Sequence, residues 1–346
     1  MTPRTGRARI GWSALSGAVG VLAVVLSALM IVGPGIALEM TTLVIGTAKD
    51  PNLGTELVIA REKGYFKAVG LDVELKYFPS GGDLSAAIVG GSLAIGSSGS
   101  TPTTTLRGAP FPIKILAQMS DISGAQQIIV KPEIRRPEDL HGKRIGMLKG
   151  TSSEIMVDSM AKAYGVDLGK VERVSMGPTE MLSGFIRGDL PAVSLWEPHS
   201  TRARKGGSGR ILLSGTTSYV PGREGPDRIY GDHSTLFATE DFIRKNPKTV
   251  RAVLEALARA VDYVEKDPTG ATAVLANEFG MPADDMREIM KVNRYQMVID
   301  QVMVDDLNRI AEFLFSLGKL KSKQPVTEWI DTAPLREVRP EWVRIK

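Results

Sequence analysis

Three short loops of small and hydroxyl-bearing residues each lie between an apolar run typical of a strand and a run typical of a helix. They are Pro-Ser-Gly-Gly at 79–82, Gly-Ser-Ser-Gly-Ser-Thr-Pro at 96–102 and Lys-Gly-Thr-Ser-Ser at 149–153. A helix N-terminus leaves about four backbone N–H groups unpaired and carries roughly half a positive charge. Several such ends facing one crevice can bind a small polar or anionic molecule, so the pattern predicts a solute-binding site.

Apolar and amphipathic segments alternate in two series along the chain. In the first series, predicted strands at 43–45, 73–77, 93–95 and 113–119 accompany helices at 56–63 and 83–89. In the second, strands at 126–130, 144–147, 171–175 and 192–195 accompany helices at 152–164 and 180–187. This order predicts an α/β fold of two lobes, each a mainly parallel sheet flanked by helices.

The C-terminal third contains one predicted strand, at 235–238, and is otherwise helical. Apolar residues recur at helical spacing between 250 and 264, and again between 307 and 317. Helices without strands of their own pack most simply on the first sheet. We therefore expect a discontinuous first lobe (38–125 plus 234–325), a second lobe (126–233) and a C-terminal tail (326–346). Two crossings, near Gln126 and His233, would form a hinge. A separate C-terminal helical domain is the alternative.

The first 37 residues have the pattern of a signal peptide. Arg4, Arg7 and Arg9 precede an apolar stretch at 14–32, and Gly-Ile-Ala at 35–37 offers small residues for cleavage. Because the apolar stretch approaches the ~20 residues that span a bilayer, an uncleaved membrane anchor is the alternative. In both cases residues 38–346 are expected outside the inner membrane, in the periplasm.

Composition excludes several classes of protein. Residues 1–37 hold three arginines and no acid, so the remainder, with 40 basic and 39 acidic residues, gives no indication of nucleic-acid binding. The chain has no cysteine, which excludes disulfides, thiolate metal sites and a cysteine nucleophile. The histidines are dispersed (141, 199 and 233), so neither a metal site nor a cofactor is predicted.

Five motifs in order resemble the periplasmic substrate-binding proteins for aliphatic sulfonates, taurine and nitrate, a group that includes thiamin-precursor-synthase-like proteins. They are FPSGGD at 78–83, GGSLAIGSSGSTP at 90–102, EDLHGKRIG at 138–146, KGTSS at 149–153 and WEPH at 196–199. The resemblance runs from about 43 to 277, and FIRKNPKTVRA at 242–252 fits the return helix of that family. It implies a two-lobe, type II Venus-flytrap fold with two crossover strands.

This sequence departs from the family pattern at three places. Ala94 stands where the family usually has aspartate, Leu190-Pro191-Ala192 replaces Val-Asp-Ala, and His199 replaces a tyrosine. The departures bear on which ligand is bound more than on the fold.

The loop residues are the candidate ligand contacts, because ligands of open α/β sheets bind beyond the carboxyl ends of the strands. Glycine allows close backbone approach, and hydroxyl groups can donate or accept. Plain helix capping is the alternative, since serine and threonine suit it equally. The candidates are Ser80, Gly81, Gly82, Ser98, Gly99, Ser100, Thr101, Gly150, Thr151, Ser152 and Ser153.

Five further residues are predicted at the same edge. Trp196 would cover an apolar part of the ligand, unless it packs between the lobes. Asp50, Asp121 and Glu197 could receive an amine, an amide or a hydroxyl, unless they are solvated surface groups. His233, at the return crossing, could donate a hydrogen bond.

We therefore expect a monomeric solute-binding component of an ATP-binding-cassette (ABC) importer, which closes on a small organic anion or zwitterion and docks on a permease. Sulfonates such as taurine fit best, while nitrate, aromatic carboxylates and pyrimidine precursors stay open. An enzyme on the same scaffold is disfavoured, because the related desulfinase and thiamin-precursor synthase require a cysteine. A membrane-anchored sensor would require an uncleaved N-terminus.

Overall fold

The computed structural model describes residues 40–108, 111–320 and 325–345. The predicted signal peptide or anchor lies outside these residues.

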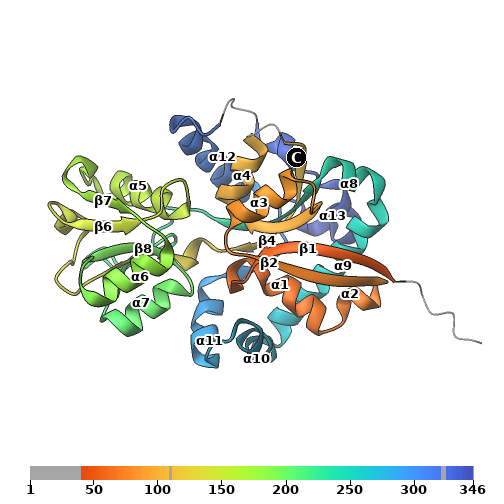
Figure 1. Ribbon diagram of the computed structural model, residues 1–346, viewed down its shortest axis with the longest axis horizontal. Helices are drawn as coiled ribbons and strands as arrows, with labels where there is room; N and C mark the ends of the chain where they lie inside the picture. Colours follow the sequence, from red (N-terminus) through yellow and green to blue (C-terminus); the bar gives the residue numbers. More distant parts are fainter. Residues whose placement is uncertain (1–39, 109–110, 321–324, 346) are drawn as a thin grey trace, which may run out of the picture. The chain divides into compact units, whose positions relative to one another are not determined.

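The first sheet draws its strands from two separate stretches of the chain (Figure 1). Its order is β13-β4-β12-β3-β1-β2. The strands are β1 (Thr41–Ala48), β2 (Leu71–Phe78), β3 (Ile95–Gly99), β4 (Ile113–Asp121), β12 (His233–Thr239) and β13 (Arg294–Tyr295). With the helices that flank it, this sheet forms what we call the first lobe.

The second sheet uses the chain between the two parts of the first. Its order is β11-β10-β9-β5-β8-β6-β7. The strands are β5 (Gln126–Val130), β6 (Arg144–Met147), β7 (Glu172–Ser175), β8 (Ala192–Trp196), β9 (Arg210–Ser214), β10 (Thr217–Ser218) and β11 (Gly225–Pro226). This sheet and its helices form the second lobe.

The strand that enters each sheet from the other lobe runs against its neighbours. β12 is antiparallel to both β3 and β4, and β5 is antiparallel to both β8 and β9. The strands β1, β2 and β3 run parallel to one another, as do β6, β7 and β8. Each sheet is therefore mixed. A strand that arrives from the other lobe through a short crossing enters at the end of the sheet where the parallel strands finish, so it runs in the opposite direction.

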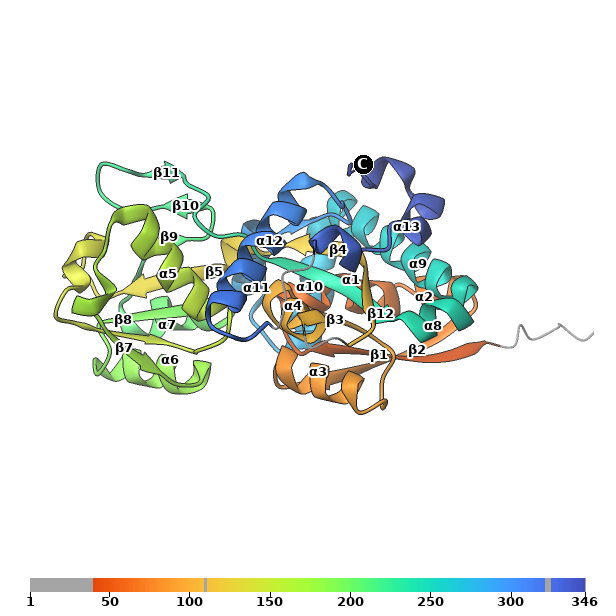
Figure 2. The ribbon, with the colours of Figure 1, turned by 90° about the horizontal axis from the view of Figure 1, so that it is seen from above.

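Helices cover both faces of each sheet (Figures 1 and 2). In the first lobe, α1 and α9 pack together on one face while α3 and α4 pack on the other. In the second, α5 covers one face while α6 and α7 cover the other. Those of the first lobe are α1 (Pro51–Glu62), α2 (Tyr65–Ala68), α3 (Gly81–Val89), α4 (Ser100–Gly108), α8 (Glu240–Lys245), α9 (Pro247–Lys266), α10 (Pro268–Phe279), α11 (Ala283–Val292), α12 (Gln301–Ser316) and α13 (Ala333–Val338). Those of the second are α5 (Ser152–Tyr164), α6 (Pro178–Arg187) and α7 (His199–Gly207).

Apolar periodicity explains the two long C-terminal helices. On α9, the residues Val250, Leu254 and Leu257 are fully buried in the core of the first lobe. On α12, Leu307 packs in that same core, whereas Ile310 and Leu314 pack in the core of the second lobe. The helix α12 therefore contacts both cores.

Two sequence expectations differ from the structure. The segment 96–102 was expected to be a loop, but β3 continues to Gly99 and α4 begins at Ser100 with no residue between them. Pairing with β1 and β12 makes this glycine-serine run a strand, although it has no apolar pattern. The segment expected as a tail also packs: Val326, Trp329 and Leu335 lie in the core of the first lobe.

Candidate functional site

Two of the predicted loops lie against each other in the first lobe. Ser80 is the N-cap of α3 and accepts from the Asp83 backbone N–H. A Cβ atom on Gly81 would come within 2.6 Å of Ser98 Oγ and 2.5 Å of Pro102. The ends of α3 and α4 therefore meet, and glycine at position 81 allows that approach.

The N-terminus of α4 is capped by an aspartate that sequence reasoning missed. The backbone N–H groups of Ser100 and His233 donate to Asp232 Oδ1 at 3.0 and 2.9 Å. Asp232 is 6% exposed, and burial raises its pKa although the bond from Ser100 opposes the shift. A carboxylate therefore already stands where we expected a free helix end to receive an anion.

Three buried hydroxyl groups belong to residues near the start of α4. The hydroxyl oxygen of Ser98 is buried and has no hydrogen-bond partner in the protein, while those of Thr101 and Tyr230 are buried beside each other. Tyr230 lies beside both Thr101 and Asp232. Buried hydroxyls usually find a partner, so the Ser98 hydroxyl is a candidate contact for a ligand.

Asp50 provides a second carboxylate in the first lobe. It is the N-cap of α1, and its Oδ1 accepts from the Asn52 backbone N–H at 2.7 Å. Burial, with a smaller contribution from the Asp232 charge, raises the pKa of Asp50 to about 6. The two carboxylates are thus close enough to interact, and a positive charge would relieve their repulsion.

In the second lobe, the loop at 149–153 leads directly into α5. Gly150 has a φ of 76°, and Thr151 caps the helix through the Ser153 N–H. The hydroxyl of Ser153 is buried and donates to the Ser194 carbonyl oxygen at 2.7 Å, so it holds α5 to β8. Ser152 is half-buried. The side chains of Thr151 and Ser80 therefore act as helix caps. Capping is the alternative to ligand contact that the sequence left open.

Trp196 is the last residue of β8 and Glu197 follows it, next to the same edge. Trp196 is partly exposed and meets His199 edge to face, with ring centroids 6.1 Å apart. The Glu197 carboxylate accepts from Gln127 Nε2 and the Thr201 N–H, so it faces the second lobe's own residues. Its backbone carbonyl contacts the first lobe instead.

The two lobes meet at the ends of β1 and β8. Asn52 donates from Nδ2 to the Glu197 carbonyl oxygen at 2.8 Å, and Asn293 donates to Asn52 Oδ1 at 2.9 Å. All three residues are buried. This contact places the Asp50 loop beside the Trp196 strand.

Asp121 and His233 lie at the crossings between the lobes. Arg228 donates to Asp121 Oδ2 at 3.1 Å and to Asp306 Oδ2 at 2.5 Å, and His233 Nε2 lies 2.9 Å from the same Asp306 oxygen. Burial alone would raise the pKa of Asp121, but His233 and Arg228 hold it below its usual value. These two predicted site residues thus have structural partners that join both crossings to α12.

The residues that sequence reasoning missed share a position in the chain. Asn52, Tyr230 and Asp232 each lie within three residues of a predicted site residue, at strand ends or crossings. Nothing local distinguishes them, since their neighbours in space, Glu197, Thr101 and Ser100, lie more than 100 positions away in the chain.

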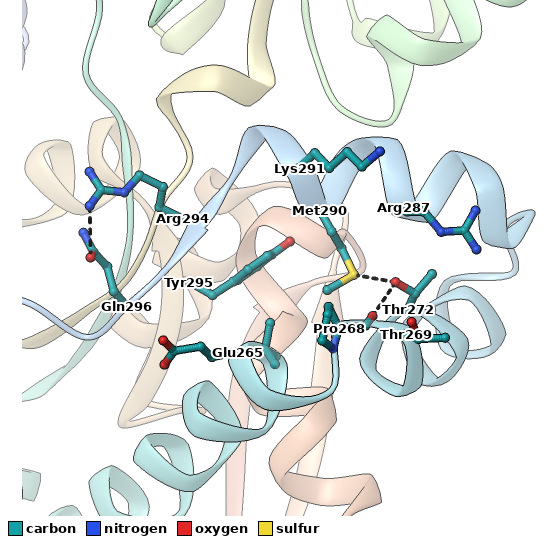
Figure 3. A pocket seen from close by; sticks show the side chains of 11 residues that line it. Glu265, Pro268, Thr269, Thr272, Arg287, Met290, Lys291, Arg294, Tyr295 and Gln296 are labelled. Atoms are coloured by element: carbon teal, nitrogen blue, oxygen red, sulfur yellow. Dashed lines mark hydrogen bonds between the residues drawn. The ribbon is translucent and has the colours of Figure 1, made fainter.

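A separate pocket of about 500 Å³ lies between α9, α10, α11 and β13 (Figure 3). Tyr295 lies at its centre, with Met290 and Lys291 along α11 and Glu265 on the opposite side. Its lining includes none of the predicted ligand contacts. Among the described residues, no group of carboxylates and imidazoles could hold a metal ion. Within the same part of the chain, every helix is too short or too polar to cross a membrane.

Two mixed sheets, joined by two crossings and facing each other with their strand ends, define the fold of the two-lobe periplasmic binding proteins. The sequence model of the "NMT1/THI5 like" family matches residues 53–271, and the chain belongs to this family.

Comparisons with individual proteins agree with this family assignment. The taurine-binding periplasmic protein of Escherichia coli is 26% identical over 276 residues, which cover 76% of this chain and 83% of that protein. The periplasmic aliphatic sulphonate-binding protein SsuA of Escherichia coli is similar in structure, with a TM-score of 0.71 and 19% identity over 84% of this chain and 92% of that one. The desulfurization enzyme DSZB has the same fold, with a TM-score of 0.66 and 16% identity over 87% and 99%.

Proposed function

We propose that this protein is the solute-binding component of an ABC importer, located in the periplasm, and that its lobes close on a small zwitterion. The observation that carries the ligand class is a pair of carboxylates at helix ends of the first lobe: Asp50 caps α1, and Asp232 accepts from the Ser100 N–H that begins α4. A simple anion such as nitrate would be repelled there, whereas an ammonium group would be attracted.

The sulfonate or carboxylate group of the ligand would lie at the N-termini of two other helices, α3 and α5. The N–H groups of Gly81 and Gly82 open α3, and that of Ser152 opens α5, where the Ser153 N–H already donates to Thr151 Oγ1. Both ends attract sulfonate or carboxylate oxygens. Trp196 would cover the short apolar part between the two charges. Taurine, which the relative from Escherichia coli is named for binding, has this arrangement.

Closure would follow from ligand contacts on both lobes. The crossings near Gln126 and His233 would act as the hinge, with the first lobe at 38–125 plus the return segment and the second at 126–233. Groups from both lobes contact the ligand together only in the closed state, so the ligand favours that state. The closed form would dock on a membrane permease as a monomer.

Isothermal titration calorimetry with taurine, ethanesulfonate and nitrate tests the ligand class. We expect taurine to bind at least about tenfold more tightly than ethanesulfonate, which lacks the amine. Asp232→Asn should remove this preference, while Asp241→Asn, an exposed aspartate on α8, should retain it. Equal affinity for ethanesulfonate or nitrate in the unaltered protein would contradict the proposal.

Catalysis is not part of the proposal, although DSZB has a similar fold. A desulfinase of that kind requires a cysteine nucleophile, and this chain has no cysteine. An assay with aryl sulfinates should therefore release no sulfite.

A further inference from the structure

A cluster of ion pairs joins α7 of the second lobe to α11 of the first. Lys205 Nζ lies 2.5 Å from Asp285 Oδ1 and 3.6 Å from Glu288 Oε1, and Arg204 lies 3.2 Å from Glu288 Oε2. We call these four residues the interlobe clasp. Two cations from one helix meet two carboxylates from the other.

The clasp lies on the two segments that carry the buried contact between the lobes. The helix α7 begins two residues after Glu197, whose carbonyl accepts from Asn52. The helix α11 ends one residue before Asn293, which donates to the same Asn52. The position of α7 against α11 therefore sets how closely the Trp196 strand end approaches the Asp50 loop.

The clasp is partly shielded from water. The side chain of Asp285 is 20% exposed and that of Arg204 is 27% exposed, whereas Lys205 and Glu288 are nearly half exposed. Exposed ion pairs are individually weak and gain from forming a network. Because these pairs exist only while α7 and α11 are in contact, their whole contribution favours one arrangement of the lobes.

We propose that Arg204, Lys205, Asp285 and Glu288 are positioning residues that hold the two lobes together and so raise the affinity of the cleft for its ligand. This inference rests on the proposed function for its ligand, but the contact between the lobes can be tested without any ligand.

Charge reversal with rescue is the test in the presence of taurine. Lys205→Glu places three carboxylates together, and we expect its Kd to rise about five- to tenfold. Adding Asp285→Lys to that variant restores an opposite-charge pair and should bring the Kd back to within about twofold of the unaltered protein. Lys245→Glu is the matched control, because Lys245 pairs with Asp241 within α8 at 2.9 Å.

The distance between two spin labels, one on each lobe, tests the clasp without ligand. Since the chain has no cysteine, Ala86→Cys on α3 and Thr179→Cys on α6 give one exposed label on each lobe. Lys205→Glu should broaden or shift the distance between the labels, and the double reversal should restore it, while Lys245→Glu leaves it unchanged. The same distribution should widen as NaCl rises from about 10 mM to about 1 M, because the Debye length falls from roughly 30 to 3 Å.

The outcomes separate the two proposals. Label distances that do not differ between Lys205→Glu and Lys245→Glu would overturn the clasp, whatever the ligand. A distance change that depends on the clasp, without binding of any sulfonate, would support the clasp and contradict the proposed ligand. If Lys205→Glu weakens binding but Asp285→Lys does not rescue it, the effect does not arise from this ion pair and the inference fails.

Discussion

Asn52 and Glu197 are 145 positions apart in the chain, yet the amide of one donates to the backbone carbonyl of the other at 2.8 Å. The bond joins the first helix of the first lobe to the strand end that carries Trp196. It is buried, so its loss would leave a carbonyl group without a partner.

We predict that Asn52→Ala weakens ligand binding. The variant loses the bond to Glu197, and the Asn293 amide keeps only its longer bond to the Tyr295 hydroxyl at 3.4 Å, at a cost of about 1–2 kcal/mol. If closure requires this contact, the Kd for taurine should rise about five- to thirtyfold by calorimetry. Asn308→Ala, a half-buried asparagine on α12, is the control and should bind normally. A normal Kd for Asn52→Ala would show that closure does not depend on the bond.

The raised pKa of Asp50 predicts a pH dependence of binding. At pH 8 its carboxylate is charged and attracts an ammonium group, whereas below its pKa of about 6 it is protonated and neutral. Affinity for taurine should therefore fall as the pH decreases from 7 to 5, by at most about tenfold per pH unit. Calorimetry at several pH values measures the change.

Asp50→Asn provides the comparison for that titration. Asparagine retains the helix cap but cannot titrate, so the variant should bind weakly with a flatter profile between pH 5 and 7. An unaltered profile would assign the titration to another group, with Asp232 the first candidate.

The carboxyl group of Glu56 should make the free energy of unfolding depend on pH. This residue of α1 is fully buried, its Oε1 accepts from the Ser120 hydroxyl and its Oε2 has no partner. Burial raises the pKa of Glu56 to about 7 from an ordinary 4.5. The folded state therefore binds the proton more tightly than the unfolded state, and stability should fall as the pH rises from 4.5 through 7.

Glu56→Gln should remove this loss, because its neutral amide keeps the shape of the protonated acid. At pH 8 the variant should be more stable than the unaltered protein by roughly 3 kcal/mol. Urea unfolding at pH 5 and pH 8 measures the difference, which should nearly disappear at pH 5. A variant that is less stable at both values would contradict the assignment.

Substitution of Asp306 should cause a large loss of stability. Its carboxylate contacts Arg228 and His233 from the crossing and Arg309 from its own helix, and it is 1% exposed. Asp306→Asn removes the charge and leaves Arg228 without its closest partner. We expect a loss of about 2–4 kcal/mol, below the upper range for buried pairs because Arg228 is partly exposed.

Its neighbour Asp305 is exposed, so Asp305→Asn is a matched control that should change stability by less than about 0.5 kcal/mol in urea unfolding. Burial opposes ionisation of Asp306, but hydrogen bonds from His233 and Arg228 outweigh it and lower its pKa. Its contribution is therefore present above the ordinary carboxyl pKa of 3.8 and is lost as the pH falls below that value. Equal stability of the two variants would contradict a structural role for Asp306.

Sequence patterns located the regular elements because their causes are local. The predicted bounds of β5, β6 and α5 agree with the structure, since apolar spacing and the flanking glycine and hydroxyl residues specify them. The order of the elements also predicted two lobes, and the motifs predicted a fold that the family match supports.

Only the tertiary structure decided the chemistry of the strand ends. The glycine-serine run of β3 is a strand because β1 and β12 pair with it, and the end of α4 is acidic because Asp232 reaches it from 132 positions away. The apolar stripe of α12 showed a buried helix but not that it enters both cores. A local pattern specifies which face of an element is buried, whereas the partner on that face is set by the free energy of the whole packed chain.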